Sequence, residues 1–215
     1  MKKNHFIAVL LTILTSSISL WGQNIKSNSI DLTYSPVTLK ASGGGTSISA
    51  NMDAFSANWA QTMSLTDRHP IFLQYGAGLQ YAWGGDKETS YGTTFKNTIS
   101  FLTAKIPVNV LYRLDIPNTE YAFVPYFGIN LQGHILGQAT YSYNNVSETT
   151  NYFSKDDMGE GRYNRLVVGW QIGARLTYQR YFLGIAYEGP ITNLYKENNV
   201  KLNMSQINLS LGFSF

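Results

Sequence analysis

The chain has no cysteine and few charged residues. Without cysteine among its 215 residues, a disulfide framework, a lipid-modified N-terminal cysteine and thiolate chemistry are excluded. Charged residues make up 13% of the chain, against roughly 25% in an average soluble domain. The formal net charge of +3 includes Lys2 and Lys3, so the chain without them is nearly neutral and lacks the basic footprint of a nucleic-acid binder.

Long apolar runs are also missing. Beyond the N-terminus no stretch approaches the ~20 apolar residues of a membrane-spanning helix, which excludes a helical membrane protein. The N-terminus itself has Lys2 and Lys3, an apolar run over residues 6–14 and small polar residues over 15–19. This pattern predicts a secretory signal peptide over residues 1–22, cut after Gly22 or alternatively after Ser19, followed by one domain over residues 23–215.

What the chain does have is alternation with a period of two. From residue 71 to 83 the odd positions are apolar or aromatic and the even positions are mostly small or polar, and residues 166–178 repeat the pattern. Thirteen residues make a strand longer than the ~5 to 6 usual in globular sheets. Similar segments cover approximately residues 29–39, 52–65, 98–114, 121–136, 181–188 and 205–215.

About eight such strands suit a membrane. Tilted strands of ~9–11 residues cross a bilayer, and lipid requires every backbone donor and acceptor to be paired within the protein. We therefore predict an all-β fold, an eight-stranded antiparallel up-and-down transmembrane β-barrel in the outer membrane.

Pro107 and Pro125 fall inside predicted strands, where they cannot donate to a ladder. We expect a bulge or a bond-free position at each, and a soluble two-sheet sandwich is the alternative.

The predicted connections alternate in length. Residues 66–69, 115–120 and 179–180 are short, whereas 40–51, 84–97, 137–164 and 189–203 are long, as expected for periplasmic turns and extracellular loops. A two-residue turn at 179–180 pairs Tyr178 with Tyr181, which places Gln171 opposite Glu188.

The alternation divides candidate site residues between two faces. The predicted inward polar network consists of Asp31, Lys105, Asn109, Asn130, Gln132, His134, Gln171, Arg175 and Glu188. Buried charges are costly unless paired, so we favour a plugged lumen over a ligand path. Aromatic residues gather near the periplasmic strand ends, as in an interfacial girdle, at Tyr112, Tyr121, Tyr178, Tyr181, Phe213 and Phe215.

Several motifs carry a family resemblance. The run from Ala104 to Arg113 with the Ile116-Pro117-Asn118 turn, and the run from Pro125 to Asn130, resemble the outer-membrane β-barrel domain family of Bacteroidetes-type envelopes, the OmpX-like or porin-family small barrels. The alternating C-terminus ending in Phe215 resembles the strand by which such barrels reach the insertion machinery, which the resemblance implies as a partner during assembly. Eight strands leave no wide aqueous channel.

Signals for catalysis or metal binding are weak. His69 lies in a predicted turn, and His134 faces inward with Ser142 and Ser147 in the following loop, but no motif joins them into a triad. Asp156, Asp157 and Glu160 lack calcium-loop spacing, and residues 42–47 read as a flexible loop rather than a phosphate cradle. We therefore predict no enzyme, no cofactor and no metal.

The segment 137–164 is the candidate for surface recognition. It contains Tyr141, Tyr143, Tyr152, Phe153 and Tyr163 among many Asn, Ser and Thr residues. Such a composition suits partner recognition, and it also suits a plain external loop. Our leading hypothesis is a non-enzymatic barrel with a structural or surface-interaction role, in contact with outer-membrane lipid. The alternatives are a narrow channel or transporter and a soluble periplasmic binder.

Overall fold

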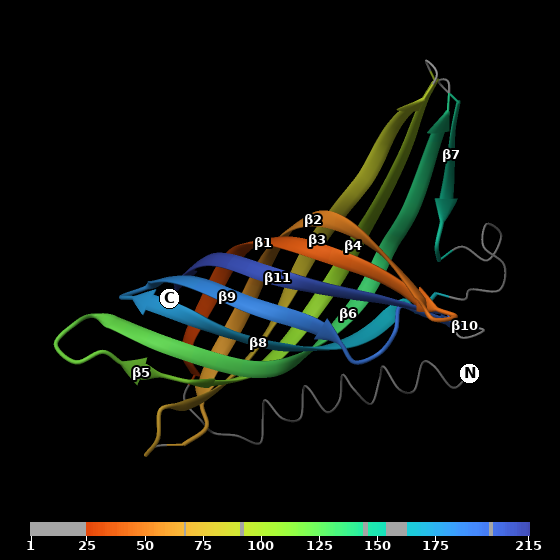
Figure 1. The fold of residues 1–215 in the computed structure, drawn as a ribbon. Helices are drawn as coiled ribbons and strands as arrows, with labels where there is room; N and C mark the ends of the chain where they lie inside the picture. The colour runs from red at the N-terminus through yellow and green to blue at the C-terminus, as the bar shows by residue number, and fades with distance from the viewer. Residues whose placement is uncertain (1–24, 67, 91–92, 144–145, 154–162, 198–199) are drawn as a thin grey trace.

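Eight long strands form a closed ring in the described part of the computed structural model, which covers residues 25–66, 68–90, 93–143, 146–153, 163–197 and 200–215 (Figure 1). The predicted signal peptide, residues 1–22, lies outside the described residues. The ring strands are β1 (Ile25–Gly43), β2 (Thr46–Ser64), β3 (Ile71–Ser90), β4 (Thr93–Tyr112), β6 (Tyr121–Tyr143), β8 (Leu166–Tyr178), β9 (Tyr181–Pro190) and β11 (Val200–Ser214). The short strands β5 (Leu114–Asp115), β7 (Val146–Asn151) and β10 (Tyr195–Glu197) extend hairpins at the two ends.

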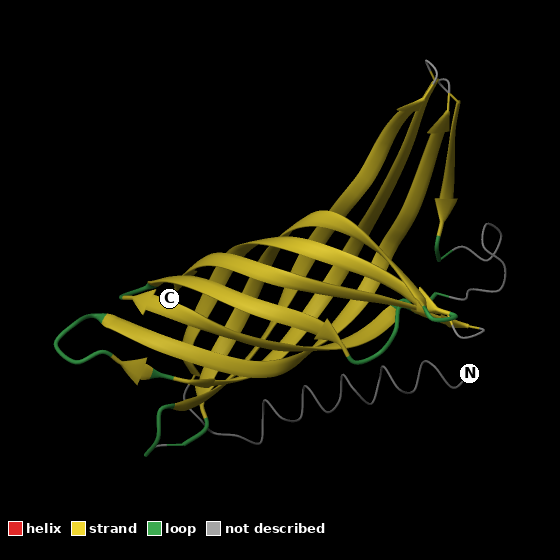
Figure 2. Ribbon diagram, viewed as in Figure 1, coloured by secondary structure: helices red, strands yellow, loops and turns green. Residues whose placement is uncertain are grey.

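Pairing between the first and last strands closes the ring. The order is β1-β2-β3-β4-β6-β8-β9-β11, each pair antiparallel, and β1 pairs with β11 from Ser29↔Ser214 to Ser42↔Lys201. Figure 2 shows strands around the whole barrel wall. The described residues contain no helix long and apolar enough to cross a membrane. The expected all-β, up-and-down antiparallel barrel is confirmed, and the sandwich alternative is wrong because a sandwich leaves sheet edges that this ring lacks.

The register predicted for one hairpin is correct. Tyr178 pairs with Tyr181 across the turn at Gln179 and Arg180, and Gln171 pairs with Glu188. Gln179 has a positive φ of 51°, which a tight turn of this kind requires. The phase assigned from alternation therefore holds along β8 and β9.

Where the structure describes them, the segments expected as long loops are largely strands, which corrects the sequence-based prediction. Residues 42–47 form a tight hairpin: Gly43 pairs with Thr46, and Gly44 and Gly45 between them have φ values of 57° and 83°. Two consecutive left-handed residues make the turn that matches strand twist, and glycine adopts that conformation without steric cost. The triple glycine therefore allows a tight two-residue turn and does not form a flexible loop.

Three of the hairpins extend the wall well beyond the bilayer. Strands of 19 to 23 residues in β1, β2, β3, β4 and β6 exceed the ~9–11 residues that a crossing needs. On one side β3, β4 and β6 continue upward together and β7 folds back along β6, so that four strands project from the barrel (Figure 1). The short turns lie at the opposite end, which is the periplasmic end by the usual barrel arrangement.

Prolines fall where the ladder is interrupted, as expected. The β3–β4 register is unchanged on both sides of Pro107, but Gly76, which faces Pro107, and the next residue, Ala77, have no paired partner on β4. Pro125 pairs with Ala174 on β8 and lies beyond the last β4–β6 pair. Pro36, which the sequence reading passed over, lies in a similar gap between β1 and β11. Each proline therefore costs a few ladder bonds without shifting the register.

A bulge in β6 changes which residues face inward. Leu102 pairs with Leu136, whereas Thr103 pairs with His134, so Ile135 is the extra residue. Ile135 and Leu136 are both exposed, and beyond them the inward position passes from even to odd numbers, with Ala139 buried. Bulges re-aim side chains in this way, and here the change comes directly after His134.

Candidate functional site

Glu188 on β9 is the centre of a hydrogen-bonded network inside the barrel. The residue is 4% exposed, and its Oε2 accepts hydrogen bonds from Lys105 Nζ at 2.9 Å and Gln206 Nε2 at 3.1 Å. Gln132 donates to Oε1, and Asn208 Nδ2 lies 3.4 Å from Oε2. A buried carboxylate is costly unless it is paired and hydrogen-bonded, and donors from β4, β6 and β11 meet that need here.

The remaining predicted inward residues lie around this centre. Asn109 accepts a hydrogen bond from Gln171, and Asn130 accepts one from Gln132 at 2.9 Å. Asp31 lies on the β1–β2 side, where Thr33 and Asn58 donate to its Oδ1 at 2.8 and 2.7 Å. The structure thus places all nine predicted residues on the inner side, but it separates Asp31 from the Glu188 network and His134 from both.

Arg175 lies between aromatic rings rather than against a carboxylate. Its guanidinium carbon is 5.0 Å from the centre of the Tyr126 ring and 4.9 Å from that of Phe182. Its Nε is buried and has no hydrogen-bond partner among the described residues. A cavity of about 70 Å³, lined by Arg175, Asp31, Lys105 and Glu188, lies at mid-depth and is large enough for a few water molecules at most.

His134 forms a pair with Thr103. His134 Nδ1 and Thr103 Oγ1 are 2.9 Å apart, and both residues are buried. The imidazole ring lies 5.8 Å from the Phe101 ring centre and 5.9 Å from that of Phe153. A hydroxyl beside an imidazole is the start of a nucleophile–base pair, but a substrate would have to displace these rings to reach it.

The serines considered as partners for His134 lie elsewhere. Ser142 and Ser147 pair with each other across β6 and β7. Ser142 is eight residues along β6 from His134, about 26 Å in a strand. His69 is exposed in the turn after β2, where its backbone N–H donates to Thr66 Oγ1 at 3.0 Å. No His–Ser catalytic arrangement is therefore present among the described residues.

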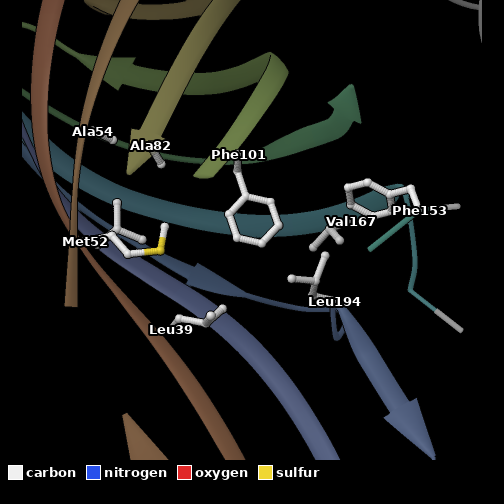
Figure 3. Close-up of a cluster of buried hydrophobic side chains, with 9 residues drawn as sticks. Leu39, Met52, Ala54, Ala82, Phe101, Phe153, Val167 and Leu194 are labelled. Atoms are coloured by element: carbon white, nitrogen blue, oxygen red, sulfur yellow. The ribbon is translucent and has the colours of Figure 1, made fainter. Parts of the chain in front are cut away.

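A cluster of apolar side chains, called the plug below, lies inside the barrel above the polar network (Figure 3). Its buried members are Val37, Leu39, Met52, Ala54, Ala82, Phe101, Phe153, Val167 and Leu194 (Figure 3). Phe153 follows β7 and Leu194 precedes β10, so both come from connecting segments that fold back into the barrel. Arg165 holds Phe153 in place, with its guanidinium carbon 5.1 Å from the ring centre and NH2 3.2 Å from the Phe153 carbonyl oxygen.

Sequence reasoning missed several members of the network. Gln206 and Asn208 on β11 bind Glu188, and Gln80 on β3 donates to Gln206 at 3.1 Å. The C-terminal alternation that places Ile207 and Leu209 outward also places Gln206 and Asn208 inward, so this signal was available. The inward turn of Phe153 and Leu194 had no comparable signal, because it depends on where two loops fold.

The predicted girdle residues lie at the periplasmic end of the outer wall. Tyr112, Tyr121, Tyr178, Tyr181 and Phe215 are exposed, and Phe213 is half-buried. Tyr121 contacts Tyr178 with 4.8 Å between ring centres, and Tyr181 contacts Phe213 with 5.4 Å. Between this band and the extracellular end the outer wall is apolar, with Leu32, Leu183 and Leu211 each exposed. Such a wall suits contact with lipid.

The projecting sheet of β3, β4, β6 and β7 is the other candidate surface. Tyr141 and Tyr143 on β6 share a face with Val146 and Glu148 on β7, because the register pairs Tyr143 with Val146 and Tyr141 with Glu148. A groove of about 330 Å³ runs over this face. At the base of the sheet, burial raises the pKa of Tyr152 to about 12, with nearby Tyr141 and Tyr163 adding to the effect.

Sequence comparison decides the family. Residues 6–215 match the model of the outer membrane protein β-barrel domain. The chain belongs to this family. It is an outer-membrane protein, and the soluble periplasmic alternative is wrong because both the family and the apolar outer wall require a membrane. No curated protein sequence matches the chain.

Solved barrels show similar folds at low identity. Neisserial surface protein A has 15% identity and a TM-score of 0.40, covering 86% of this chain and 97% of its own. The attachment invasion locus protein of Yersinia pestis, solved with a heparin analogue, has 12% identity and a TM-score of 0.41, covering 86% and 99%. The outer membrane enzyme PagL has 13% identity and a TM-score of 0.38, covering 83% and 98%. Likenesses this distant say nothing about a ligand or an activity.

Proposed function

We propose that this protein is a non-enzymatic outer-membrane barrel that binds an extended polypeptide segment of a surface partner through its projecting sheet of β3, β4, β6 and β7. The observation that carries the proposal is the outer strand of that sheet. Among the described strands β7 pairs with β6 alone, so its other edge offers backbone donors and acceptors. An edge strand of this kind is a template for a partner strand.

The face beside this edge supports the proposal. Val146 is 71% exposed and Tyr141 is 55% exposed, although both lie outside the lipid-facing wall. The groove next to them also has Lys96 and Glu148 among its lining residues. Aromatic side chains provide contact area at low conformational cost, and flanking charges add specificity, a combination typical of recognition surfaces.

The interior supports a role for the barrel as an anchor. The Glu188 network fills the middle of the lumen and the apolar plug fills its extracellular end, which argues against a solute path. The His134–Thr103 pair is buried against Phe101 and Phe153, which argues against catalysis. With the middle and the extracellular end of the lumen filled, the chemistry available to a partner outside the cell lies on the outer surfaces of the barrel.

The proposal is tested by selecting peptides that bind the protein in nanodiscs from a displayed random library. Selected peptides should bind the wild-type protein and lose binding to the triple variant Tyr141→Ser, Tyr143→Ser and Val146→Ser. The matched control is Ile48→Ser, which removes another exposed apolar side chain from the β1–β2 hairpin at the same end. Equal binding to the triple variant, or equal loss in the control, contradicts the proposal.

A further inference from the structure

The periplasmic end of the lumen contains a second, larger cavity. It has a volume of about 560 Å³ and opens among the ends of β1, β4, β8 and β9. Arg113, Arg175 and Arg180 all line it, and no Asp or Glu side chain does, so the one carboxylate in the lining is the terminal one of Phe215. Arg175 also lines the 70 Å³ cavity at mid-depth, so it forms the boundary between the two.

Two of these arginines have no carboxylate partner in the described part of the chain. The described ion pairs join Lys105 to Glu188 and Arg113 to Asp115, the latter with 2.6 Å between Nε and Oδ1. Arg175 is oriented instead by the rings of Tyr126 and Phe182. This stacking holds the guanidinium plane while its buried Nε is left without a hydrogen-bond partner.

A buried hydroxyl on the cavity wall adds a second unsatisfied group. Ser29 is 3% exposed, lines the cavity, and its buried Oγ has no hydrogen-bond partner among the described residues. The main-chain oxygen of Phe215 is no partner for this hydroxyl, because it accepts its hydrogen bond from Asn28 N–H, at 2.9 Å. Native proteins rarely leave buried donors without an acceptor, so a cavity with two of them is suited to an acceptor-rich ligand.

We propose that this cavity, lined by Ser29, Arg113, Arg175, Thr177 and Arg180, is a periplasmic binding site for a phosphate group. A guanidinium fork matches phosphate oxygens with paired, charge-assisted hydrogen bonds, and the unpartnered hydroxyl of Ser29 adds a neutral donor. The phosphate belongs to a lipid headgroup of the inner leaflet or to a soluble phosphate ester. The site lies at the opposite end from the projecting sheet and is independent of the proposed function.

The test measures inorganic phosphate binding by isothermal titration calorimetry, using the whole protein in micelles of a maltoside detergent, which carries no phosphate. Arg175→Gln with Arg180→Gln should weaken binding by about tenfold or more, since each removes charge-assisted hydrogen bonds. The matched control removes two exposed positive charges at the other end, Lys40→Gln with Lys201→Gln, and should bind like the wild-type protein. Arg180→Gln alone serves as a second variant, because its side chain is exposed and the fold does not depend on it.

A second arm separates the two sources of phosphate. In nanodiscs containing phosphatidylglycerol, weaker apparent binding of inorganic phosphate identifies a lipid headgroup that competes for the site, and unchanged binding identifies a soluble phosphate. Absence of phosphate binding in the phosphate-free detergent overturns the proposal. Equal weakening in the lysine control, or wild-type binding by both arginine variants, overturns it as well.

Discussion

Lys105 on β4 and Glu188 on β9 form an ion pair across the lumen, with 2.9 Å between Nζ and Oε2. Their strands are separated in the ring by β6 and β8, so the pair spans the interior instead of running along the wall. Both side chains are buried, and three amide side chains complete the shell of Glu188. The pair therefore connects β4 and β9, on different sides of the lumen, through the carboxylate of Glu188.

Breaking this pair should be costly. Glu188→Ala leaves the Lys105 ammonium buried without a counterion, and we expect the free energy of unfolding to fall by about 3–5 kcal/mol. The double variant Lys105→Met with Glu188→Leu replaces both charges with apolar groups and should recover most of that loss. Urea unfolding in detergent micelles, followed by tryptophan fluorescence, measures both. A single variant as stable as the wild-type protein, or a double variant no better than the single one, contradicts this account of the network.

The close approach of β2 and β3 at Gly76 gives a second prediction. A Cβ at Gly76 would lie 2.2 Å from the Trp59 carbonyl oxygen and 3.0 Å from Ala60, so Gly76→Ala forces backbone apart. We expect a loss of about 1–3 kcal/mol. Gly133→Ala is the control, because the nearest atom to its Cβ, the Ala104 carbonyl oxygen, is 3.9 Å away. Heat-modifiable gel migration and urea unfolding compare the two, and equal losses would refute the steric explanation.

Half-buried Tyr152, which packs against the plug, predicts a pH dependence. The Tyr152 ring stacks on Phe101 with 5.7 Å between centres, and burial raises the pKa of its hydroxyl to about 12 from the usual value of about 10. The folded protein therefore holds this proton more tightly than the unfolded chain. Its contribution to stability is complete below pH about 10 and is lost as the pH rises from about 10 to about 12.

Tyrosinate absorbance measures this titration directly. The difference between the wild-type protein and Tyr152→Phe should be one tyrosine that titrates near pH 12. A difference curve centred near pH 10 would show that Tyr152 is solvated and that the plug does not cover it.

The alternation of apolar and polar residues predicted the barrel well, because it depends only on whether each residue faces lipid or the lumen. Successive residues of each strand face opposite sides of the barrel wall, one lined by lipid and one by the lumen. The eight strands, the Tyr178–Tyr181 turn and the Gln171–Glu188 pair could therefore be derived from the sequence. The bulge at Ile135 could not be derived, because the residues that follow it, Gly137, Gln138 and Ala139, do not show from their type which of them face inward.

The apolar packing in the lumen could not be predicted from the sequence pattern either. Phe153 and Leu194 pack into the lumen from connecting segments, and their positions depend on contacts with Phe101 and Val167 far away in sequence. The glycines at 43–45 predict a flexible loop from composition alone, because composition does not distinguish a mobile loop from a tight turn. The positive φ values at Gly44 and Gly45 show which of the two applies.

The central claim is that the lumen is blocked at its middle and at its extracellular end, so that no solute passes through the barrel and a partner outside the cell meets only its outer surfaces. Conductance of the purified protein in planar lipid bilayers tests this most directly. We predict no steady single-channel steps for the wild-type protein, because the Glu188 network and the Phe101–Phe153 plug block the passage in series. Steady, ion-selective steps that disappear when these lumen residues are altered would contradict the claim.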